Sequence, residues 1–273
     1  MLTDSTLRSF LNSLTTEGLS ENTRIAYKKD CLAFLTWRVT KPVTLAWPET
    51  EALAAQFLNE CRQQLAPKTV IRYRGTLRRW AEFDGCPFAF LAKYRTPPAP
   101  PAVPHPLPEG IQGVLAMIGS TTNPKHKALC ALTGLVGLRV DEATNVEPSD
   151  INLHERSVTI CGKGEKTRIV PLTDMVLGII MPAYKLAVAN GTTLVDLTES
   201  GARKSIRRHG RRAGLSRDVA SHDMRSTAAT EMYERTHDIR AVQEILGHSD
   251  VRTTQGYTKI SEAAKRAALE SLT

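Results

Sequence analysis

The 273-residue sequence lacks an apolar run long enough to cross a membrane. Its longest candidate, residues 128–136, is interrupted by Thr133 and Gly134, whereas a membrane-spanning helix needs roughly 18 apolar residues. Residues 1–4 also lack the basic region and the apolar segment of a secretory signal. These absences exclude a membrane-spanning helix and predict a cytoplasmic protein without a membrane partner.

Cysteine is scarce as well, with five residues and no Cys-x-x-Cys pair. An odd number at scattered positions argues against a disulfide framework and against a zinc cluster, and it is typical of a reducing cytoplasm. Cys31 and Cys61 fall within apolar-periodic stretches, where we expect them to be small core residues. The sequence predicts neither a metal nor an organic cofactor.

Acidic residues are missing from two long basic segments. The formal net charge of +8 and the pI near 9.4 favour a polyanionic partner. No acid lies between Glu60 and Glu82 or between Glu199 and Asp218, although both segments are rich in arginine. Each is either a solvated helix face or a phosphate-binding surface, and we favour the second because solvated faces usually mix both signs. The candidate contact residues are Lys68, Arg72, Arg74, Arg78, Arg79, Arg203, Arg207, Arg208 and Arg211.

Proline is concentrated at one place, with seven of the 15 prolines between residues 97 and 108. Such a stretch is typical of an extended, semi-rigid linker. A proline-rich ligand for an SH3-type partner is the alternative, but the stretch separates two well-patterned blocks. We therefore predict a helical domain at 1–96, a linker at 97–106 and a second domain at 107–273.

The first block carries helical patterns throughout. Leu7, Phe10, Leu11 and Leu14 follow helical spacing, and Gly18 is placed to end that helix. Further helices are predicted after the capping residue Ser20, after Thr50, and over residues 67–84, which include most of the first basic segment. Four short helices with one basic helix indicate a DNA-gripping module.

The second block has a mixed pattern. Helices are predicted over 109–118 and 124–136, and again over most of 173–273. Residues 157–161 and 168–172 are rich in β-branched side chains and flank a Gly-containing loop, which predicts a β-hairpin. The fold class is therefore mainly α with a small β-hairpin (α+β), in two domains.

Several residues of the second block match the needs of metal-free phosphodiester transfer. The reaction requires a hydroxyl that can deprotonate, for which tyrosine is better suited than an aliphatic alcohol. It also requires bidentate arginines for the charge that develops on phosphate, and a histidine or lysine as a general acid. The sequence offers such a set in Arg139, Lys163, His222, Arg225, His248 and Tyr257.

The local setting of these residues is specific. Arg139 follows a glycine-bearing turn and opens a predicted helix, and Lys163 lies at the predicted hairpin. His222 and Arg225 are three residues apart, hence on one helix face. His248 follows the helix-ending Gly247, and Tyr257 comes nine residues later.

In this order and spacing, the segments resemble the signature of the tyrosine recombinase (phage integrase) family: G-L-R-x-x-E, a hairpin lysine, H-x-x-R, G-H and tyrosine. The interval of 26 residues from His222 to His248 is also typical of that family. The resemblance spans residues 135–259, and residues 20–27 more weakly resemble the family's core-binding domain. Each motif alone would indicate only a structural residue, but five in family order indicate a common function.

The resemblance implies a role for each matched residue. Tyr257 would attack the scissile phosphate to form a 3′-phosphotyrosyl link, while Arg139 and Arg225 hold its non-bridging oxygens. Lys163 would protonate the leaving oxygen; Lys166, three residues later, matches the family less well. His222 would assist proton transfer, His248 would donate a hydrogen bond to the phosphate, and Glu142 would orient the cluster from behind. A metal site on His222 and His248 lacks a third ligand.

The resemblance also implies a C-shaped clamp on double-stranded DNA and strand exchange by a homo-tetramer through a Holliday junction, without ATP. From the residues alone, the C-terminal tail, residues 261–273, could pack on its own domain or on a neighbouring subunit; the resemblance favours the neighbouring subunit. An accessory directionality factor is a possible partner. Because the first helix begins almost at once, we expect a simple integrase or a Xer-like enzyme without an arm-binding domain, acting at the bacterial nucleoid. Two alternatives stay open, a type IB topoisomerase and a non-catalytic DNA-binding regulator.

Overall fold

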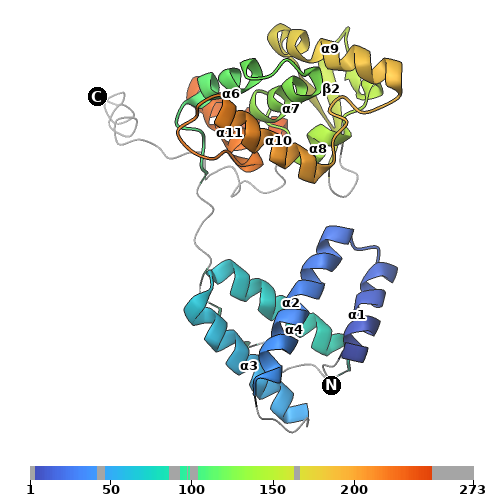
Figure 1. Ribbon diagram of the computed structural model, residues 1–273, viewed down its shortest axis with the longest axis vertical. Helices are drawn as coiled ribbons and strands as arrows, with labels where there is room; N and C mark the ends of the chain where they lie inside the picture. The colour runs from blue at the N-terminus through green and yellow to red at the C-terminus, as the bar shows by residue number, and fades with distance from the viewer. Residues whose placement is uncertain are drawn as a thin grey trace, which may run out of the picture. The chain divides into compact units, whose positions relative to one another are not determined.

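The computed structural model describes residues 4–41, 47–85, 93–96, 98, 104–162 and 167–247. The chain divides into two compact units, Met1–Pro100 and Pro101–Thr273 (Figure 1). Each unit has its own hydrophobic core. Within the described residues, none of the helices combines the length and the apolar character that crossing a bilayer requires.

The first unit contains four helices, α1 (Asp4–Thr16), α2 (Glu21–Val39), α3 (Trp47–Gln64) and α4 (Pro67–Phe83). Its core includes the ring of Phe10 stacked on Trp80, with centroids 6.2 Å apart. Ser20 caps α2 as predicted, accepting a hydrogen bond from the backbone N–H of Thr23. The predicted start of the third helix was wrong, because Thr50 is buried inside α3, which begins at Trp47. Pro48 in the first turn, where a missing N–H costs nothing, was the better signal.

The second unit is mainly helical. It contains α6 (Gly110–Gly119), α7 (Pro124–Gly134), α8 (Val140–Asn145), a 3-10 turn η1 (Pro148–Asp150), α9 (Asp174–Asn190), α10 (Glu199–Arg212), α11 (Ser221–Thr236) and α12 (Ile239–Leu246). Helix α7 lies among α6, α9 and α11 (Figure 1). Its residues 128–134 are all buried, so it forms the centre of this core. This explains why residues 128–132 form a continuous apolar run rather than a single stripe.

A small sheet completes the second unit. Strands β1 (Ile151–Asn152), β2 (Ser157–Cys161) and β3 (Thr167–Pro171) pair antiparallel in that order. The predicted hairpin is confirmed, with Thr159 opposite Ile169. The two-residue strand β1 was not predicted, because it is too short to show an alternating pattern.

Candidate active site

Arg139 and Glu142 form the first part of the site, at the start of α8. Gly137 precedes them in a left-handed conformation (φ +82), which reverses the chain after α7. Arg139 occupies the N-cap position of α8, as the sequence predicted. Its backbone N–H and its guanidinium donate to the carboxylate of Glu142, at 2.9 and 2.8 Å. The side chain of Arg139 is still 41% exposed, and its guanidinium has donors left for a ligand.

His222 and Arg225 come from the first turns of α11 and lie on one face, as their spacing predicted. The side chain of Arg225 is 3% exposed, and its guanidinium donates to the carbonyl oxygens of Gly137 and Leu246, both at 2.7 Å. One guanidinium nitrogen is also 3.8 Å from the carboxylate of Glu142. Arg225 therefore joins the turn before α8 to the end of α12.

Arg168 on β3 is a functional residue that the sequence analysis missed. Its guanidinium donates two hydrogen bonds to the carboxylate of Glu142, at 2.9 and 2.8 Å, and a third to the carbonyl oxygen of Ile245, at 2.9 Å. The strand pattern could have identified Arg168, because it alternates with Ile169 and shares the inner face of β3 with buried Val170. An arginine on that face must find a partner for its charge.

Three arginines thus surround one buried carboxylate. Burial alone would raise the pKa of Glu142, but hydrogen bonds from Arg168 and from the Arg139 backbone, with the attraction of both guanidinium groups, lower it to about 2. Glu142 is therefore ionised at neutral pH. Because one carboxylate faces three guanidinium groups, the cluster keeps a positive charge that can attract a phosphate.

Unlike Glu142, His222 favours its uncharged form. Burial lowers the pKa of His222, and the nearby Arg225 lowers it further, while the attraction of Asp223 raises it. The imidazole is therefore neutral at neutral pH, which leaves one ring nitrogen able to accept a proton.

A pocket of about 300 Å³ opens in front of this cluster. It is lined by Arg139, Asp141, Arg203, His222 and Arg225, among others. The structure therefore brings together three members of the predicted catalytic set and one predicted DNA-contacting residue, Arg203. The arginines around the pocket match the charge and geometry of phosphate oxygens, and the neutral histidine beside them could accept a proton. No group of three or more His, Cys, Asp or Glu side chains suited to a metal occurs within the described part of the chain.

The rest of the predicted set, namely Lys163, Lys166, His248, Tyr257 and the tail at 261–273, lies outside the described residues.

Of the predicted contact residues on α4 and α10, five form ion pairs with carboxylates. The most buried of those acids is Asp30, which receives a bidentate pair from Arg72. The local absence of acid therefore did not mean that these arginines lack acidic partners. The five pairs are Arg72–Asp30, Arg78–Glu82, Arg79–Glu17, Arg203–Glu199 and Arg211–Asp218.

Comparison with known proteins places this geometry in a family. Residues 111–264 match the phage integrase family, and residues 7–84 match the N-terminal SAM-like domain of phage integrases. Tyrosine recombinase XerD of Staphylococcus haemolyticus (strain JCSC1435) is 29% identical over 92% of both chains. Tyrosine recombinase XerD of Lacticaseibacillus casei is 28% identical over 93% of this chain and 94% of its own.

Solved structures share the fold. A XerH site-specific recombinase bound to its difH substrate, in a pre-cleavage complex, has a TM-score of 0.69 and 21% identity, covering 92% of this chain and 79% of that one. A lambda integrase dimer bound to a COC′ core site has a TM-score of 0.71 and 19% identity, covering 95% and 96%. The predicted fold class and the predicted family are both confirmed. Since the family match spans more than half of the chain, the protein belongs to the phage integrase family and is a tyrosine-type site-specific recombinase.

Proposed function

We propose that this recombinase cleaves and rejoins double-stranded DNA through a covalent 3′-phosphotyrosyl intermediate on Tyr257. The observation that carries the proposal is the pocket in which Arg139, Arg225 and His222 meet in front of Glu142. Two arginines beside one neutral histidine match the charge and the proton transfer that phosphodiester exchange requires. Arg168 and Glu142 act as positioning residues, because they hold the arginines rather than line the pocket.

In the proposed reaction the hydroxyl oxygen of Tyr257 attacks phosphorus and passes its proton to His222. The bond between phosphorus and the 5′ oxygen breaks, and Lys163 protonates that oxygen to give a free 5′-hydroxyl. His248 donates a hydrogen bond to the phosphate. In the reverse direction the 5′-hydroxyl of another strand attacks the phosphotyrosine, which restores the diester and the tyrosine. Bonds of similar energy are exchanged, so the reaction needs no ATP.

The assembly is also part of the proposal. The first unit would act as a core-binding domain and the second as the catalytic domain, joined by the proline-rich linker. Four copies would exchange two pairs of strands in turn through a Holliday junction. A lambda integrase tetramer bound to a Holliday junction, 18% identical and with a TM-score of 0.69, supports this part of the proposal. The tail at 261–273 would dock into a neighbouring copy.

The test is the Tyr257→Phe variant on a suicide DNA substrate. The variant lacks only one hydroxyl, so it should bind DNA with unchanged affinity in a gel shift and form no denaturant-resistant protein–DNA adduct. Tyr184→Phe, a matched change on α9, should form the adduct at the normal rate. An adduct that persists in Tyr257→Phe would assign the nucleophile to another residue.

A further inference from the structure

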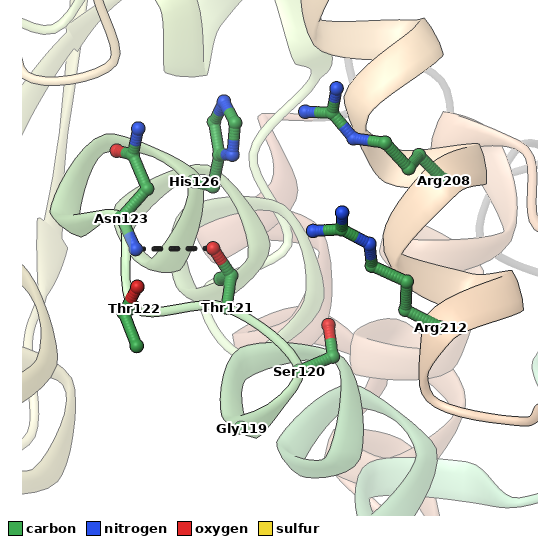
Figure 2. Close-up of a pocket in the computed structure, with 8 residues that line it drawn as sticks. All are labelled: Gly119, Ser120, Thr121, Thr122, Asn123, His126, Arg208 and Arg212. Carbon is green, nitrogen blue, oxygen red and sulfur yellow. Dashed lines mark hydrogen bonds between the residues drawn. The ribbon is translucent and has the colours of Figure 1, made fainter.

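A second pocket, of about 430 Å³, lies between the loop that joins α6 to α7 and the C-terminal half of α10. Arg208 and Arg212 extend from α10 toward His126 and the loop hydroxyls (Figure 2). The pocket shares no lining residue with the Arg139–Arg225 pocket. Its arginines lie five and nine residues beyond Arg203, which is roughly 8 and 14 Å along α10.

The two arginines of this pocket differ in pairing from their neighbours on α10. Arg203 and Arg211 are bound to Glu199 and Asp218. Among the residues that the structure describes, no carboxylate lies within ion-pair distance of Arg208 or Arg212. Like charges four residues apart on a helix repel one another. A bound anion would remove that repulsion.

A chain of hydrogen bonds behind the pocket fixes the protons of two histidines. The hydroxyl of Ser120 donates its single proton to the carbonyl oxygen of Met117, at 2.7 Å. Nδ1 of His209, 3.0 Å from that hydroxyl, must therefore be the donor to Ser120. Nε2 of His209 then accepts from Nδ1 of His126, at 3.1 Å. Since His209 is completely buried, Nε2 of His126 is the remaining nitrogen of the pair that can take up a proton.

In the absence of a ligand both imidazoles are neutral at pH 7. Burial lowers the pKa of His126, and the charges of Arg208 and Arg212 lower it further. The same causes, with His126 itself, lower the pKa of His209 to about 4. Among the residues that the structure describes, the charged groups that act on His126 are these two arginines of α10. On α7 itself, Lys125 is paired with Asp196, and Lys127 is the next residue in the chain. An anion in the pocket offsets the arginine charges and so favours a protonated His126.

We propose that this pocket binds a phosphate group and takes up a proton at His126 as it does so. Two guanidinium forks suit tetrahedral phosphate oxygens, and the hydroxyls of Thr121 and Thr122 lie at the same rim. The first turn of α7, which Asn123 caps, adds the favourable end of a helix dipole. The phosphate belongs either to the DNA backbone or to a free phosphate compound. This site is separate from the strand-transfer pocket, and Tyr257→Phe should retain it.

The first experiment follows the ring signals of His126 by NMR during pH titration of the full-length protein. Dimethyl phosphate is the diester probe, because it does not itself titrate in this range, and inorganic phosphate is the free probe. We expect either probe to move the titration of His126 to higher pH, and dimethyl phosphate to bind several-fold more tightly at pH 6 than at pH 8. In His126→Asn, whose amide can replace the Nδ1 donor toward His209, binding should persist without that pH dependence.

The second experiment separates the ligand sources and controls for general charge. Arg212→Ala should weaken binding of the probes about tenfold, as expected for loss of a charged hydrogen bond. Arg235→Ala, which removes an exposed arginine of α11, should not. If DNA supplies the phosphate, Arg212→Ala also lowers the salt-dependence slope of duplex binding by about one unit; an unchanged slope assigns the site to a free phosphate compound. The proposal is overturned if neither probe nor duplex moves the His126 signal, or if Arg235→Ala weakens binding as much as Arg212→Ala.

Discussion

Arg225 donates a hydrogen bond to the carbonyl oxygen of Leu246 at 2.7 Å, and so ties the residue proposed to hold phosphate to the last residue of α12. Arg168 binds the preceding carbonyl, that of Ile245. Two arginines thus satisfy consecutive carbonyls where the helix dipole is negative. The chain leaves this end toward His248, so the same arginines that surround Glu142 set the starting point of the segment proposed to carry His248 and Tyr257.

Arg168→Ala should lower the free energy of unfolding of the second unit by about 3 kcal/mol, because it leaves the buried carboxylate of Glu142 with fewer partners. Arg156→Ala, which breaks an exposed pair with Asp174, should cost less than about 1 kcal/mol. The measurement is urea unfolding followed by far-UV circular dichroism. Tryptophan fluorescence serves as the internal control, since Trp37, Trp47 and Trp80 all belong to the first unit and should report an unchanged transition. Equal losses for the two variants would contradict the bridging role of Arg168.

The stability that Glu142 contributes should depend on acid pH. Its pKa in the folded protein, about 2, lies below the ordinary value of 4.5, so its contribution is complete above pH 4.5 and is lost as pH falls toward 2. The shift corresponds to about 3 kcal/mol. The difference in unfolding free energy between wild type and Glu142→Gln should therefore shrink by about this amount between pH 5 and pH 2. A difference that stays constant over that range would show that Glu142 is not ionised in the cluster.

Lys68 and Arg72 should respond differently to alanine substitution, although both were predicted to contact DNA. Lys68 is exposed on the first turn of α4, so Lys68→Ala should lower the salt-dependence slope of DNA binding by about one unit and leave stability unchanged. Arg72→Ala should instead cost about 2 kcal/mol in the tryptophan-detected unfolding of the first unit, because Asp30 is buried and, among the residues that the structure describes, keeps only Thr76 as a partner. If Arg72→Ala changes only the slope, the pair with Asp30 is not structural.

Gly247→Ala should reduce DNA cleavage much more than the matched change Gly191→Ala. Both glycines end a helix in the left-handed conformation, where a side chain costs about 1 kcal/mol. A Cβ at Gly191 would meet open space, whereas one at Gly247 would lie 2.9 Å from two atoms of the Arg168 side chain. We expect Gly191→Ala to recombine normally and Gly247→Ala to lose most adduct formation while retaining DNA affinity. Equal activity of the two variants would show that the position of Arg168 is not critical.

Deletion of residues 261–273 should leave a folded protein that binds a single half-site but assembles poorly on a full site. The expected cause is loss of the tail that docks into a neighbouring copy. Gel-shift titration on half-site and full-site DNA, together with thermal unfolding, measures both effects. Reduced thermal stability with weaker half-site binding would place the tail on its own subunit instead.

The sequence predicted those parts of the structure that depend on local pattern. Ser20 as a cap, the β2–β3 hairpin and Arg139 at the opening of a helix were all visible in short segments. The distant partners of the arginines were not, because Asp30 and Arg72 are 42 residues apart and only the packing of α2 on α4 brings them together. Arg168 was missed for the same reason, since Glu142 and Ile245 reach it from distant helices. The roles of Lys163, His248 and Tyr257 stay predictions from the family resemblance.

Helix α10 places Arg203 in one pocket and Arg208 and Arg212 in another. One inserted or deleted residue between Arg203 and Arg208 would turn one set of arginines by about 100° relative to the other, besides shifting it by about 1.5 Å. No choice of side chain at the new position would restore the relative direction of the two sets of arginines. Length variation in this helix should therefore be far more damaging than substitution on its exposed face, and libraries built on this protein should vary residue identity in α10 at constant length.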